Sequence, residues 1–264
     1  MSVQHKTIDI GGRKVSYTLA GDPKNTPLVF LHGWGARTGK YISQEHVISE
    51  FAKYYYVVAP EHPGLIRSEP PNKIWVMSDF VDNLHELFMM ASINTFILVG
   101  QSFGGGIATQ YAGTYPKSVR SLVLIDSVYP LRRSNWYFKL RYLWEPIFSW
   151  ILATKRVPIL LKKLLINCYL GVPWNNITRD NAIKWIHLAK TNIRSIVTTD
   201  LSTLTMPVIL IWGKKDTFMT PIDDARNILL KNIPHAKFFE VEGGHTFLYK
   251  FPKRAGDIMK KELS

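Results

Sequence analysis

Five apolar runs divide the chain into alternating strand-length and helix-length segments. They are Pro27–Leu31, Tyr55–Ala59, Phe96–Val99, Leu122–Ile125 and Val208–Trp212. Short apolar runs without polar alternation are typical of strands buried on both faces, as in a parallel sheet. Two further strands, Thr7–Ile10 and Lys14–Leu19, flank Gly11-Gly12 and predict a hairpin, and Phe238–Val241 predicts a last strand.

Helix-length segments lie between these strands. We expect helices over residues 42–52, 75–90, 104–115, 221–231 and 252–262. Alternating strands and helices predict an α/β fold, with a mostly parallel central sheet and helices on both faces.

The alternation stops between Leu131 and Ser202, where apolar residues such as Trp136, Leu140 and Leu143 recur at helical spacing instead. This pattern indicates an inserted helical cap. We therefore predict an α/β core made of residues 1–130 and 203–264 and a cap made of residues 131–202.

The predicted cap is also the basic part of the chain. The whole chain has a formal net charge of +13. Residues 131–200 contain 12 Lys or Arg against 3 Asp or Glu, a net charge of +9, and five of the eight tryptophans. Such a segment is compatible with an acidic partner, an anionic membrane surface or nucleic acid. A solvated outer face is the alternative, and we expect no nucleic-acid partner.

Composition indicates a globular protein without a membrane anchor. Hydrophobic residues make up 46% of the chain, and Cys168 is the single cysteine, so no internal disulfide can form. The first ten residues contain no apolar signal-like stretch, and no run of about 18 apolar residues exists. We predict a cytoplasmic protein with no transmembrane segment.

The sequence Gly100-Gln101-Ser102-Phe103-Gly104 lies between a predicted buried strand and a predicted helix. The pattern G-x-S-x-G is common by chance, but in this context it predicts a sharp turn that exposes a nucleophilic serine. The turn leaves no room for a Cβ atom at the flanking glycines. Ser102 is therefore the candidate nucleophile.

A serine nucleophile needs a base, and the base needs a group to orient it. His245 follows the last predicted strand, and Asp216 follows the strand that ends at Trp212. The order Ser, Asp, His is the one expected for this type of turn. Asp126 is the rival acid because it also follows a buried strand, and Asp216 could instead be a turn or helix-capping residue.

Acyl transfer also needs N–H donors for the developing oxyanion. The segment His32-Gly33-Trp34-Gly35 follows the strand that ends at Leu31. We predict that the backbone N–H groups of Trp34 and Phe103 form the oxyanion hole and that His32 is structural. No motif implies a metal or a cofactor.

Together these motifs resemble those of the α/β-hydrolase superfamily, and the chain is most similar to its small capped carboxylesterases. One departure is Ile66, which stands where the family often has the second glycine of an Asp-x-Pro-Gly-x-Gly-x-Ser loop. We expect that loop to differ locally. The H-G-W-G loop and the basic cap are also similar to those of pimeloyl-acyl-carrier-protein methyl ester carboxylesterases, which implies a substrate bound to an acidic carrier protein.

The predicted function is hydrolysis of small-molecule carboxylic esters through an acyl-enzyme, with Ser102, His245 and Asp216 as catalytic triad. One alternative is a hydrolase of the same fold that acts on C–C, amide or lactone bonds. The other is a module that binds a ligand without turning it over.

Overall fold

The computed structural model describes residues 3–34, 44–128, 147, 150–151, 154, 156–170, 197–217 and 221–263. Most of the predicted cap, including Arg132 and Arg133, therefore lies outside the described residues, and the boundaries of the cap stay a prediction.

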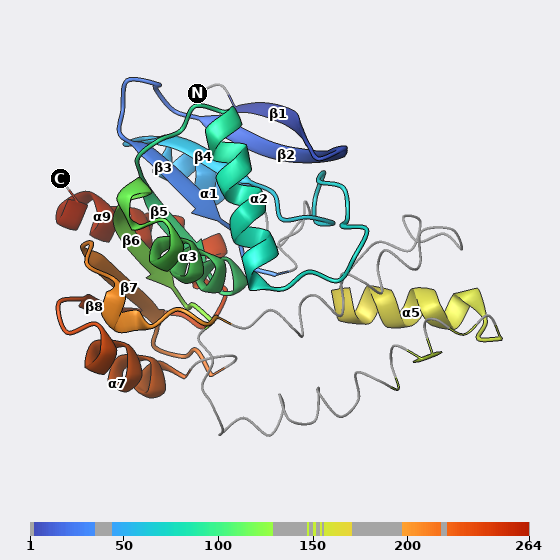
Figure 1. Ribbon diagram of the computed structural model, residues 1–264. Coiled ribbons are helices and arrows are strands. Elements are labelled where there is room, and N and C mark those ends of the chain that lie inside the picture. Colours follow the sequence, from blue (N-terminus) through green and yellow to red (C-terminus); the bar gives the residue numbers. More distant parts are fainter. Residues whose placement is uncertain are drawn as a thin grey trace.

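The described residues form one eight-stranded sheet with the strand order β1-β2-β4-β3-β5-β6-β7-β8 (Figure 1). The strands are β1 (Val3–Ile10), β2 (Arg13–Ala20), β3 (Pro27–Leu31), β4 (Tyr56–Pro60), β5 (Phe96–Gln101), β6 (Val119–Ile125), β7 (Val208–Gly213) and β8 (Lys237–Val241). β2 pairs antiparallel with β1 and β4, and every other neighbouring pair is parallel. The prediction of a mostly parallel sheet is confirmed.

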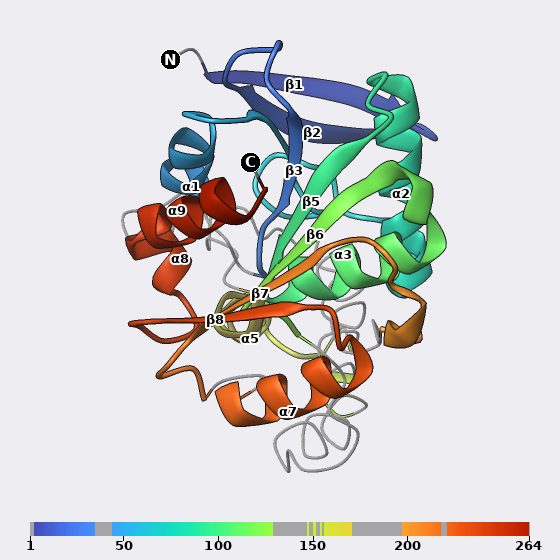
Figure 2. The same cartoon turned by 90° about the vertical axis from the view of Figure 1, so that its left-hand side faces the viewer.

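Helices cover both faces of the sheet (Figure 2). The helices α2 (Met77–Met90), α3 (Phe103–Thr114) and α7 (Ile222–Asn232) contribute to one hydrophobic core. The helices α1 (Gln44–Phe51), α8 (Phe247–Lys250) and α9 (Pro252–Leu263) contribute to the other. Successive residues of β3 alternate between the two cores, with Leu28 in one and Val29 in the other, which explains why its sequence is apolar throughout.

Every apolar run of the sequence lies in or overlaps a strand, and the predicted hairpin turns at Gly11 and Gly12, whose φ angles are 58° and 77°. The strand ends differ from prediction by a few residues, most of all in β1, which begins at Val3. The short helix α8 was not predicted. Its four residues give no periodicity to detect.

One described segment of the cap region is helical as predicted, namely α5 (Ile159–Leu170). Its residues Leu160 and Leu164 are exposed, at 65% and 44% of their maximal surface. No helix in the described part of the chain is both long and apolar enough to cross a membrane.

Candidate active site

Ser102 occupies the turn between β5 and α3 and has φ 51° and ψ −118°, a conformation that a residue with a side chain rarely adopts. Hydrogen bonds hold the turn in place. The Ser102 N–H donates to the Ile125 carbonyl at 3.0 Å, and the Ser102 carbonyl accepts from Gly105 N–H at 2.9 Å and Val128 N–H at 3.0 Å. The strain is therefore balanced by bonds to α3 and to the segment after β6.

The turn is possible only because its flanking residues lack side chains. A Cβ atom at Gly100 would lie 2.4 Å from the carbonyl oxygen of Gly104. A Cβ atom at Gly104 would lie 2.2 Å from the carbonyl oxygen of Leu31. Both distances are far shorter than a van der Waals contact, so α3 can begin this close to β3 and β5 only at glycine.

The three residues predicted as a triad lie in one hydrogen-bonded row. His245 Nδ1 lies 2.8 Å from Asp216 Oδ2, and His245 Nε2 lies 2.8 Å from Ser102 Oγ. Because a carboxylate only accepts, Nδ1 carries the proton and Nε2 accepts from the serine hydroxyl. Asp216 is buried, whereas 15% of the His245 side chain is exposed. A base in this tautomer can take the proton of Ser102.

Main-chain hydrogen bonds join the loop of Asp216 to the loop of His245. Lys214 N–H donates to the Val241 carbonyl at 2.9 Å, and Lys215 N–H donates to the Gly243 carbonyl at 2.8 Å. A Cβ atom at Gly213 would lie 2.7 Å from the Gly243 oxygen. The two loops thus continue the contact of β7 with β8 past the ends of both strands.

Asp126, the rival acid in the sequence, also lies at this site. One carboxylate oxygen of Asp126, one carboxylate oxygen of Asp216 and one ring nitrogen of His245 all lie within 4.8 Å of one another. Such a group could in principle hold a metal ion. Both nitrogens of His245 already make hydrogen bonds, however, so a cation would have to displace Ser102 or Asp216.

The two predicted oxyanion residues lie next to each other at the serine turn. Phe103 is the first residue of α3, so its N–H has no partner within the helix. The ring of Trp34 contacts the ring of Phe103 edge to face, with 4.9 Å between the centroids. This contact holds the loop after β3 against the start of α3. The oxyanion role of both N–H groups stays a prediction.

A buried side-chain network connects this loop to the other two. Gly33 N–H donates to the Tyr249 hydroxyl at 3.0 Å, and that hydroxyl donates to Gln101 Oε1 at 3.0 Å. Gln101 Nε2 donates to the His245 carbonyl at 3.1 Å. Burial raises the pKa of Tyr249, which therefore stays a neutral donor. The loop after β3, the serine turn and the histidine loop are linked through two side chains.

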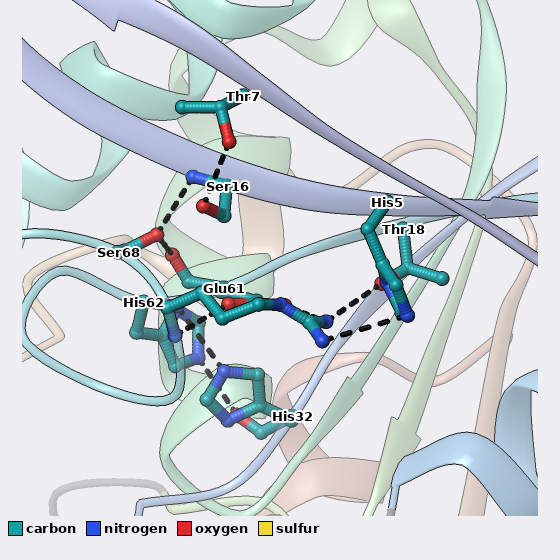
Figure 3. Close-up of polar contacts among 9 residues, drawn as sticks. His5, Thr7, Ser16, Thr18, His32, Glu61, His62 and Ser68 are labelled. Atoms are coloured by element: carbon teal, nitrogen blue, oxygen red, sulfur yellow. Dashed lines mark hydrogen bonds and ion pairs between the residues drawn. The ribbon is translucent and has the colours of Figure 1, made fainter.

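His32 is structural, as its position predicted, and its partner is His62 (Figure 3). His62 N–H donates to His32 Nε2 at 3.1 Å, and His62 Nε2 donates to the His32 carbonyl at 2.7 Å. His32 Nδ1 donates to the Gly33 carbonyl at 2.8 Å. Burial lowers the pKa of His32 to about 4 and that of His62 well below its usual value, so both rings are neutral.

The segment that carries His62 is fixed to the outer strands (Figure 3). Ser68 Oγ donates to the Glu61 carbonyl at 2.8 Å and accepts from Ser16 N–H at 2.9 Å. Glu61, whose side chain is fully buried, pairs with Arg67. Ile66 has a φ angle of 57°, the left-handed conformation that glycine adopts readily. Ile66 thus adopts a backbone conformation that strains a β-branched residue.

Sequence reasoning did not identify Gln101, Tyr249 or His62 as parts of the site. Gln101 occupies a variable position of its motif, and Tyr249 belongs to a short apolar stretch near the chain end. The polar side chain of Gln101 directly before Ser102 was the one signal in the sequence that could have pointed to this network. The other two residues reach the site only through the packing of α8 and of the loop after β4.

Comparison with known proteins gives a family match over more than half of the chain. The family profile described as alpha/beta hydrolase fold matches residues 26–163. These residues span β3, the serine turn and part of the predicted cap.

Individual relatives agree with this match. Lipase 1 of Psychrobacter immobilis is 26% identical over 89% of this chain and 75% of its own. Among solved structures, the thioesterase domain from the curacin biosynthetic pathway has a TM-score of 0.72 at 16% identity, covering 98% of this chain and 100% of that one. A bacterial membrane phospholipase A has a TM-score of 0.71 at 20% identity, covering 99% and 86%. At these identities the structures show a shared fold.

Proposed function

The chain belongs to the α/β-hydrolase fold family, and from this membership we propose that it is a serine hydrolase that cleaves carboxylic esters through an acyl-enzyme. One observation carries the proposal: two hydrogen bonds of 2.8 Å connect Ser102, His245 and Asp216. The likeness to Lipase 1 supports an ester as substrate class.

In the proposed reaction His245 Nε2 accepts the hydroxyl proton as Ser102 Oγ attacks the ester carbonyl carbon. The oxygen becomes negatively charged and accepts hydrogen bonds from the N–H groups of Trp34 and Phe103. His245 then donates the proton to the leaving alcohol, which leaves an acyl group on Ser102. A water molecule, deprotonated by His245, hydrolyses that acyl-enzyme and restores the free serine.

Asp216 accepts from Nδ1 throughout, so it holds the imidazole in the reactive tautomer and stabilises the imidazolium. The fixed geometry of the turn supports this mechanism because it removes the need to position the nucleophile during the reaction. The main-chain bonds between the two loops do the same for acid and base.

The test of the proposal is a chain-length series of p-nitrophenyl esters with the variant Ser102→Ala. We expect kcat of this variant to fall by about 10³-fold or more, because triad members act as a unit. Ser127→Ala is a matched control, since Ser127 is also buried and lies next to the serine turn. A fluorophosphonate should add its mass to the wild type and to the control, but not to Ser102→Ala. Equal turnover by all three proteins would refute the proposal.

We further propose that the basic cap binds the carrier of the substrate, an acidic protein or an anionic surface. The charge of +9 over residues 131–200 supports this. The same assays would measure it, because turnover of a carrier-bound ester would fall steeply with salt while that of a small ester would not. Charge reversal at Arg132 and Arg133 should have the same selective effect.

A further inference from the structure

Asp126 is a buried carboxyl group to which the proposed mechanism assigns no role. It directly follows β6, is 1% exposed and has a φ angle of 42°. Its Oδ1 accepts from Gly213 N–H at 2.8 Å, and its own N–H donates to the Ile211 carbonyl at 3.1 Å. These bonds fix the side chain between β6 and β7. An aspartate kept in a strained conformation at this place suggests a function.

The second oxygen of Asp126 is enclosed as well. Oδ2 accepts a hydrogen bond from no N–H or O–H group in the described part of the chain. A buried carboxylate oxygen without a donor is costly, because it has lost its hydrogen bonds to water. Asp216 is a neighbouring carboxyl group, and a carboxylate can offer only acceptors. The arrangement is satisfied if Asp126 carries a proton and donates it to Asp216.

Electrostatics lead to the same protonation state. Burial removes the carboxyl from water, and Asp216 adds a negative charge beside it. Together these raise the pKa of Asp126 to about 9, although the Gly213 N–H lowers it. At neutral pH Asp126 is therefore protonated and neutral.

We propose that Asp126 is a positioning residue of the active site. As a neutral carboxylic acid it donates a hydrogen bond to Asp216, and it thereby orients the carboxylate that accepts from His245 Nδ1. The inference rests on the proposed function, since it assigns roles within the same site.

The proton on Asp126 has a consequence for the base. A second carboxylate within 4.8 Å of His245 would stabilise the imidazolium before any substrate binds. A neutral Asp126 supplies a hydrogen bond without that charge. The pair thus orients the base and leaves it free.

Three variants separate this role from a purely structural one. Asp126→Ala removes the donor, and kcat should fall about 30-fold or more. Asp126→Asn keeps both an acceptor for Gly213 N–H and a donor for Asp216, so it should recover about 10-fold of that loss. Asp216→Asn replaces the proposed triad acid itself and should lower kcat about 10⁴-fold, because burial keeps Asp126 neutral and no carboxylate then accepts from His245.

The comparison that decides is between Asp126→Asn and Asp126→Ala. An Asp126→Asn variant no better than Asp126→Ala would overturn the inference. A second measurement does not depend on turnover. The infrared difference spectrum between wild type and Asp126→Asn at neutral pH should contain the C=O band of a protonated carboxyl, and absence of that band would also overturn the inference.

Failure of the proposed function would look different. In that case wild type and Ser102→Ala would turn over esters equally, while the infrared band would still report the state of Asp126.

Discussion

The variant Tyr249→Phe tests the network that links the three loops of the site. It removes a single oxygen atom and keeps the ring in its core. That hydroxyl oxygen accepts from Gly33 N–H and donates to Gln101 Oε1, both at 3.0 Å. Tyr249 is only 7% exposed and Gln101 only 2% exposed, so bulk water does not replace the lost partner. Two buried polar groups therefore lose their partner at once.

Each buried polar group left without a partner costs about 1–3 kcal/mol. The two groups together should lower the free energy of unfolding by about 2–6 kcal/mol. For a chain of this size 1 kcal/mol corresponds to roughly 2–4 °C in Tm, so Tm should fall by about 4–24 °C. The loop that carries Trp34, whose N–H we propose as an oxyanion donor, also loses its anchor. Since losing a whole oxyanion donor costs about 10²–10³-fold in kcat, loosening one should cost about 10-fold.

Thermal denaturation followed by circular dichroism and ester turnover would measure both effects. Tyr55→Phe is the matched control, because Tyr55 is also 7% exposed and lies in the same hydrophobic core. It should change Tm by no more than a few degrees and leave kcat unaltered. If Tyr249→Phe unfolds at the temperature of this control with unchanged kcat, the network does not position the site.

Two further predictions concern the loops after β3 and β4. The lowered pKa values of His32 and His62 mean that the folded protein binds their protons more weakly than the unfolded chain does. The stability is therefore complete above about pH 6.5 and is lost as the pH falls toward 4. Tm measured against pH should decline over this window, and less steeply in His62→Gln. Ile66→Gly should relieve the strain of φ 57° and gain about 1 kcal/mol, or roughly 2–4 °C in Tm, whereas Ile66→Val keeps a β-branched residue there and should gain nothing. Equal melting temperatures for the two Ile66 variants would contradict this reading.

The sheet could be predicted because its strands are buried on both faces. Residues such as Leu28 and Val29 point into different cores, so both must be apolar, and the run is visible in the sequence. The serine turn could be predicted because two close backbone approaches require glycine at Gly100 and Gly104. In each case a local pattern is the direct consequence of a tertiary constraint.

Other parts of the site depend on contacts that leave no local pattern. Tyr249 reaches Gly33 across 216 residues of sequence, and a tyrosine in a short apolar stretch reads like any other core residue. Asp126 and Asp216 each follow a buried strand, and the sequence presents them as rivals. Only the geometry brings both to His245 and buries Asp126 so that the pKa of its carboxyl group rises.

The main-chain bonds between the loops after β7 and β8 have a consequence for how this protein can change. Backbone groups hold Asp216 beside His245, and an ion pair of Lys214 with Glu242 also joins the two loops. The side chain of Lys215 is exposed, and Lys215 contributes to the alignment through its backbone N–H. Substitutions of Lys215 can therefore alter the surface charge next to the site without altering the acid–base pair. The chain thus has a position at which its surface can change independently of its chemistry.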